Sequence, residues 1–216
     1  MLDPGAFRTF VESYNRAVFP AQLFFYLLGI GAAVLVFVRP GKWADVAVKA
    51  VLGAFWAWLG AVYFFIHYSQ INSAGYTLGV IALGQAVYFL VDVFHRRTTF
   101  YAYTHPNLGH AGAAVAGLAF IGYPAAALLL GHGWPALQLF GMAQVGIYTC
   151  GMLLFTFDRK PKWRFTFIPV LLAFIGGLGP AAQLRYYEDY AYFAAGVVLL
   201  GAWLWASSKY KEKKKK

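Results

Sequence analysis

Seven stretches of about 20 mostly apolar residues follow one another along this chain, and they limit its possible folds more than any other feature. A helix of about 20 residues rises about 30 Å, the thickness of the hydrocarbon core of a bilayer. Of all residues, 61% are hydrophobic and 12% are charged, which leaves too few polar side chains to cover a water-soluble domain. The chain is therefore predicted to be an all-α, polytopic integral membrane helix bundle.

The predicted spans form one transmembrane domain, residues 1–208, and are separated by short polar or Gly- and Pro-containing connections. They cover residues 19–38, 47–66, 74–94, 108–130, 136–157, 165–183 and 190–206. Before them, residues 2–17 place Phe7, Phe10, Val11 and Tyr14 at helical spacing. This pattern predicts a short interfacial helix on the membrane surface.

Basic residues are distributed unevenly between the two sides of the predicted bundle. Of the 18 Lys and Arg residues, Arg8, Arg16 and Arg185 lie on one side, and nearly all others lie in the alternate connections or in the tail, residues 209–216. Because cytoplasmic loops hold the excess of Lys and Arg, we expect the amino end outside and the carboxyl end in the cytoplasm. Lys49, at the start of the second span, is expected to reach the inner interface.

The tail from residue 209 to residue 216 is polybasic, with six Lys and one Glu. A juxtamembrane run of this kind is predicted to bind anionic lipids. Binding to nucleic acid is not predicted, because the bases cluster between apolar stretches instead of lying along one polar face.

Polar and aromatic residues gather at the predicted outer ends of the spans. Such side chains cost free energy in hydrocarbon unless they face the bundle interior or a wet cavity, and an aromatic pocket with a few polar groups is typical of a ligand site. The predicted ligand- or partner-binding residues are Tyr14, Asn15, Arg16, Gln22, Tyr63, His67, Asn72, His132, Gln144, Arg185 and Glu188. Arg16 would orient an anionic group. The alternative is a set of interfacial anchors and buried pairs, such as Arg16 or Arg185 with Glu188 or Asp189.

A second group, Asp92, His95, His105 and His110, lies on the predicted cytoplasmic side. Imidazole and carboxylate groups bind metals, and paired histidines bind haem, so a haem- or metal-binding redox protein is an alternative hypothesis. No compact ligand spacing such as HxxxH occurs. The simpler interpretation is a set of solvated histidines and an ion pair between Asp92 and Arg96 one turn later.

Several segments carry a resemblance to a known family. They are YNRAVFPAQ at residues 14–22, WLGAVY at 58–63, IN at 71–72, GYP at 122–124, GHGWP at 131–135, IP at 168–169 and IGG at 175–177. With these segments, the chain resembles the uncharacterised bacterial polytopic membrane proteins grouped as domain of unknown function 6064. The resemblance implies a multi-pass protein of the bacterial cytoplasmic (inner) membrane with no assigned activity.

No motif of a phosphate loop, a zinc protease or a serine hydrolase occurs in the sequence. We therefore expect a non-catalytic protein that binds a small ligand or lipid headgroup, or that serves as an accessory subunit of a membrane complex, with no required cofactor. Gly-rich helix faces are equally compatible with a homo-oligomer and with other membrane subunits. Pro169 and Pro180 in the sixth span, together with buried glutamines, motivate a third hypothesis, a small-solute transporter.

Overall fold

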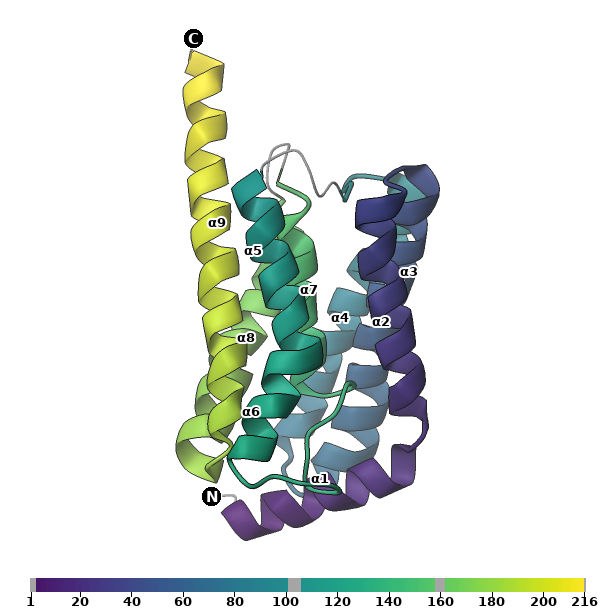
Figure 1. Ribbon diagram of the computed structural model, residues 1–216, viewed down its shortest axis with the longest axis vertical. Coiled ribbons are helices and arrows are strands. Elements are labelled where there is room, and N and C mark those ends of the chain that lie inside the picture. The colour runs from purple at the N-terminus through teal and green to yellow at the C-terminus, as the bar shows by residue number, and fades with distance from the viewer. Residues whose placement is uncertain (1–2, 101–105, 158–161, 216) are drawn as a thin grey trace.

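The computed structural model describes residues 3–100, 106–157 and 162–215. These residues form helices and turns and no strand, which confirms the predicted all-α class. Most helices run along the long axis of the molecule, whereas α1 (Pro4–Val18) crosses one end of the bundle (Figure 1). We call this end the α1 end. The amino terminus lies there, and α9 carries the carboxyl terminus to the opposite end (Figure 1).

The remaining helices follow in chain order. They are α2 (Ala21–Val38), α3 (Lys42–Trp58), the π-helical η1 (Leu59–His67), the 3-10 turn η2 (Tyr68–Gln70), α4 (Ala74–His95), α5 (Pro106–Gly117), the π-helical η3 (Leu118–Gly122), α6 (Tyr123–Leu129), α7 (Ala143–Leu154), α8 (Trp163–Leu184), the 3-10 turn η4 (Tyr187–Asp189) and α9 (Tyr190–Lys215). Helix α3 continues through η1 and η2, and α5 continues through η3 into α6.

Six helical segments are long and apolar enough to cross a membrane. They are Ala21–Val38, Lys42–Gln70, Ala74–His95, Asn107–Leu129, Trp163–Leu184 and Tyr187–Lys211. Large apolar side chains such as Leu27, Val80 and Leu129 are exposed on their outer faces. A surface of this kind suits lipid and not water, so the protein is a multi-pass membrane protein.

In place of the continuous helix predicted over residues 136–157, the structure has the shorter helix α7, which begins at Ala143. Gly141 has φ +121, a backbone conformation that glycine adopts readily and that does not continue a helix. The preceding segment passes near α1 and rises into the bundle before α7 begins (Figure 1). Ala136, Phe140 and Met142 are fully buried. Irregular backbone at this depth is tolerated where protein covers it.

Helix α1 packs its apolar face against the bundle. Phe7 contacts the ring of Tyr186 edge-on, at 5.0 Å between ring centroids. Phe10 and Tyr14 contact Tyr63, at 5.7 Å and 5.2 Å. The apolar stripe predicted for an interfacial helix therefore covers protein, and α1 closes this end of the bundle.

Candidate functional site

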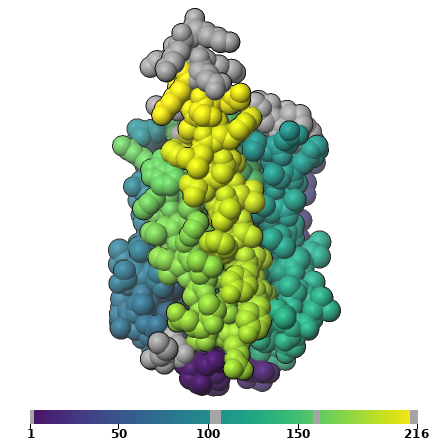
Figure 2. Space-filling view, turned by 90° about the vertical axis from the view of Figure 1, so that its left-hand side faces the viewer, coloured from purple at the N-terminus to yellow at the C-terminus, as the bar shows by residue number. Residues whose placement is uncertain are grey.

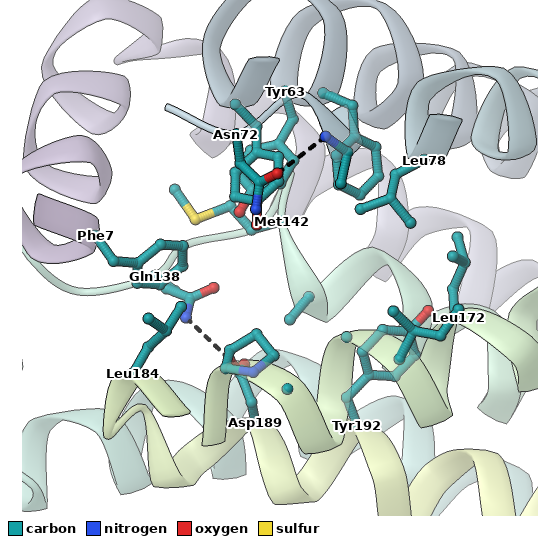
Figure 3. A pocket seen from close by; sticks show the side chains of 18 of the residues that line it. Phe7, Tyr63, Asn72, Leu78, Gln138, Met142, Leu172, Leu184, Asp189 and Tyr192 are labelled. Atoms are coloured by element: carbon teal, nitrogen blue, oxygen red, sulfur yellow. Dashed lines mark hydrogen bonds between the residues drawn. The ribbon is translucent and has the colours of Figure 1, made fainter. Parts of the chain in front are cut away.

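A cavity of about 360 Å³ lies at the α1 end of the bundle (Figure 3). Its walls come from α1, η1, η2, α4, the segment before α7, α8, η4 and α9. Most lining side chains are apolar, among them Phe7, Leu59, Leu78, Leu172 and Leu184. This composition is typical of sites that bind small molecules.

One wall of the cavity holds Asp189, the last residue before α9, as Figure 3 shows. Its carboxyl group accepts hydrogen bonds from the hydroxyl of Tyr123 and, at 3.4 Å, from the amide of Gln138. The side-chain amide of Gln144 in turn donates to the backbone carbonyl oxygen of Gln138. All four side chains are buried, so the carboxyl group of Asp189 is held at a fixed position.

The facing wall holds Tyr63 of η1 and Asn72 (Figure 3), and Tyr68 also lines the cavity. The Asn72 amide donates to the Tyr68 hydroxyl at 3.4 Å, and its carbonyl oxygen accepts from the backbone N–H of Ala74 at 2.9 Å. The rings of Tyr63 and Tyr68 lie nearly parallel, with centroids 6.0 Å apart. Polar and aromatic groups thus face the polar wall across the cavity.

The buried segment before α7 is attached to α1 through Asn15. The Asn15 amide donates to the carbonyl oxygens of Pro135 at 2.6 Å and Leu137 at 2.7 Å. Its own carbonyl oxygen accepts from the Gln22 amide at 2.7 Å. Asn15 and Gln22 are both fully buried, so these bonds position the chain that carries Gln138 into the cavity.

Tyr14 makes a second attachment between α1 and the bundle. Its hydroxyl accepts from the indole N–H of Trp58 at 2.8 Å and donates to the Gly141 carbonyl oxygen at 3.3 Å. Burial raises the pKa of this hydroxyl well above its ordinary value, so it stays protonated and available as a donor. His67 lies edge-on against the Tyr14 ring at 5.2 Å.

His132 and Glu188 form a pair at the α1 end of the bundle. The Nδ1 atom of His132 lies 2.7 Å from Glu188 Oε1, and its ring stacks on Tyr186 with centroids 4.3 Å apart. Neither Arg16 nor Arg185 takes part; both are exposed and neither lines the cavity. The buried pairs considered for Glu188 and Asp189 with Arg16 or Arg185 are therefore replaced by His132 and by neutral donors.

Helices α4 and α8 both contribute to the wall of the cavity. Figure 2 shows α4 (blue) beside α8 (green). The two helices touch near the end opposite α1, where the Gln85 amide reaches the Phe165 carbonyl oxygen at 3.4 Å. Nearer the α1 end both helices line the cavity, through Leu78 and Ile175. Ile175 is 47% exposed, so lipid can reach this wall.

A family model, described as a family of unknown function (DUF6064), matches residues 5–214. The chain belongs to this family. Every residue that lines the cavity lies within the matched residues. No curated protein and no solved structure matches the chain.

Of the predicted binding residues, Tyr63 and Asn72 line the cavity itself. Others support it: Tyr14, Asn15, Gln22 and Gln144 hold its walls through the hydrogen bonds described above. The sequence analysis did not select Gln138, Asp189 or Tyr192, all of which line the cavity. The sequence did hold a signal for Gln138 and Asp189, because both are polar residues near the predicted outer ends of spans.

The residues of the group predicted on the cytoplasmic side have separate partners where the structure describes them. The Asp92 carboxylate pairs with Lys49, at 3.0 Å between Nζ and Oδ2, and accepts from the backbone N–H groups of Arg97 and Thr98. His95 Nδ1 lies 3.0 Å from the carbonyl oxygen of Val91 in its own helix.

His110 is exposed, and His105 lies outside the described residues. Within the described ranges, no three His, Cys, Asp or Glu side chains lie close enough together to hold a metal ion. The predicted ion pair of Asp92 with Arg96 is replaced by the pair with Lys49, and Lys49 is buried instead of reaching the interface.

Proposed function

We propose that this multi-pass membrane protein is a non-catalytic binding protein that holds one small amphipathic molecule, a lipid headgroup or a comparable ligand, in the cavity at the α1 end. The observation that carries this proposal is the cavity of about 360 Å³ with mostly apolar walls and a few converging polar groups. Its size falls in the range of small-molecule sites, about 300–1,000 Å³. A headgroup or part of one chain fits this volume, and a whole phospholipid does not.

The position of the cavity supports a ligand that arrives from the bilayer. Ile175 and Gly179 of α8 line the cavity and are partly exposed on the membrane-facing surface. The polar groups Gln138 and Asp189 lie inside. An amphipathic molecule would therefore place its polar end inside the bundle and leave its apolar end toward lipid.

The hydrogen bonds inside the site support binding in preference to catalysis. Asp189 is held by Tyr123 and Gln138, and Glu188 is held by His132. Acid–base catalysis needs a titratable group positioned against a reacting atom. These carboxyl groups instead hold side chains and segments of the wall in place.

The distribution of Lys and Arg supports an orientation in the bacterial cytoplasmic membrane. Arg39, Lys42 and Arg164 lie toward the end opposite α1, as do Lys209 and Lys211 of α9. Under the positive-inside rule this end is cytoplasmic. We propose that the cavity lies at the outer side and that the Lys-rich end of α9 contacts anionic lipids of the inner leaflet.

Native mass spectrometry of the protein extracted gently from its own membrane tests the proposal. We expect a bound small molecule or lipid. Gly176→Leu should release it, because a side chain added at Gly176 starts 3.4 Å from the Tyr192 ring in the cavity wall. Gly201→Leu is the matched control, since Gly201 is exposed on α9 and a Cβ there meets no atom within 4 Å. A bare wild-type chain, or equal retention by both variants, would contradict the proposal.

A further inference from the structure

The cavity is lined by an acidic side chain and, among the described residues, by no Lys, Arg or His. Asp189 lines it, whereas Arg16 and Arg185 lie exposed elsewhere at the same end. Glu188, the neighbouring acid, has His132 at 2.7 Å. In the part of the chain that the structure describes, no Lys, Arg or His nitrogen lies within 4.0 Å of the Asp189 carboxyl group.

The hydrogen-bond partners of Asp189 are neutral. Tyr123 and Gln138 each donate one hydrogen bond to it, and the amino end of α9, which begins at the next residue, adds only a partial positive charge. A buried carboxylate without a cation costs free energy. A positively charged group in the cavity would therefore compensate the carboxylate.

The opposite wall is suited to the same kind of group. The rings of Phe7, Tyr63, Phe64 and Tyr68 line the cavity, and Tyr63 faces Asp189 across it (Figure 3). Aromatic faces attract cations, and sets of aromatic rings bind quaternary ammonium groups. The buried hydroxyl of Tyr192, which also lines the cavity, has no hydrogen-bond partner among the described residues.

From these observations we infer that the ligand is an organic ammonium with an apolar tail, its charged group placed between Asp189 and the tyrosine rings. This inference rests on the proposed function and names the chemical class of its ligand. Two sources carry this chemistry: an aminophospholipid of the bilayer and a free lipophilic amine. The apolar tail leaves between α4 and α8, where Leu78 and Ile175 line the cavity.

Calorimetric titration of the full-length protein in maltoside micelles tests the inference, with decylammonium and the neutral decanol as probes. Asp189→Asn keeps the shape of the side chain and loses its charge. We expect it to weaken the binding of decylammonium about tenfold and to leave the binding of decanol unchanged. Glu12→Gln is the control, because Glu12 pairs with Arg8 on α1 and does not line the cavity. Equal effects of Asp189→Asn on the two probes would overturn the inference.

A second pair of variants decides the case if Asp189→Asn does not fold. Tyr63→Phe keeps the ring and should bind decylammonium like the wild type, whereas Tyr63→Leu should bind it several-fold more weakly. Equal binding by these two variants would overturn the inference. If both probes bind the wild type equally and both are lost in Gly176→Leu, the inference fails and the proposed function stands. If neither probe binds the wild type, the proposed function fails as well.

The source of the ligand is distinguished on the extracted protein. Native mass spectrometry should show either an aminophospholipid or a smaller amine on the wild type, with less of it on Asp189→Asn. Retention of an anionic lipid, unaffected by Asp189→Asn, would contradict the inference.

Discussion

Lys49 and Asp92 form an ion pair in which Nζ and Oδ2 are 3.0 Å apart and the side chains are 0% and 1% exposed. The pair joins α3 to the carboxyl-terminal turn of α4 at the end opposite the cavity. Asp92 also accepts hydrogen bonds from the backbone N–H groups of Arg97 and Thr98. One carboxylate therefore connects two helices to the segment that leaves α4.

Lys49→Met is expected to lower the free energy of unfolding by about 3–5 kcal/mol, because it leaves a buried carboxylate without its cation. The measurement is unfolding by added dodecyl sulfate in maltoside micelles. Lys42→Met, on the exposed first turn of α3, should change stability little. Adding Asp92→Asn to Lys49→Met should restore part of the loss. Equal stability of Lys49→Met and Lys42→Met would show that the ion pair contributes nothing to stability.

Asn15→Ala is expected to lower the free energy of unfolding by about 1–3 kcal/mol, because the carbonyl oxygens of Pro135 and Leu137 lose a buried donor. The same change should speed proteolysis within residues 130–142. Arg16→Ala, at the next and exposed position, is the control and should leave both measurements unchanged. If Asn15→Ala were as resistant to unfolding and to proteolysis as Arg16→Ala, the attachment described for α1 would be contradicted.

Gly146→Ala is expected to displace the Tyr192 ring, since a Cβ at this position would lie 2.1 Å from Tyr192 Cζ. Forcing an extra carbon into a packed site costs about 1–3 kcal/mol, and the displaced ring should also weaken ligand binding. Gly117→Ala provides the comparison, because a Cβ there meets no atom within 4 Å. Thermal unfolding followed by tryptophan fluorescence measures both variants. Identical melting temperatures would mean that α7 and α9 do not pack as closely as described.

Reporter fusions test the orientation of the bundle. A reporter that is active only in the cytoplasm should give signal after Lys216 and none when inserted near His132, since the carboxyl end of α9 and the end of α6 lie at opposite ends of the bundle (Figure 1). The opposite pattern would place the cavity on the cytoplasmic side. Signal at both positions would contradict the number of crossings.

Apolar length was enough to predict the helix bundle and that several of the selected residues lie at one end of it. Tyr63, Asn72 and Asn15 lie far apart in the sequence, but alternation of the spans predicts that they share one end, and the structure places them there. Membrane helices follow this rule because each apolar run must cross the whole bilayer.

Long-range pairing could not be predicted in the same way. Lys49 and Asp92 are separated by 43 positions, and the sequence suggested Arg96 as the partner of Asp92 and the membrane interface for Lys49. Residues 136–142 are apolar enough to resemble the start of a span, yet Asn15 and Gly141 hold them as irregular chain inside the bundle. Asp189 and Glu188 are adjacent and chemically alike, yet Glu188 pairs with His132, whereas Asp189 accepts from Tyr123 and Gln138 and lines the cavity.

Photolabelling in the membrane tests the central claim most directly. A decylamine that carries a diazirine near its amine would be activated in vesicles containing the protein, and the labelled residues would be mapped by peptide mass spectrometry. We expect label on Tyr63 and Asp189, suppressed by excess unlabelled decylammonium and absent from Gly176→Leu. Label confined to the lipid-exposed side of α2, at residues such as Phe24 and Leu27, would show that the cavity does not bind amphipathic ligands.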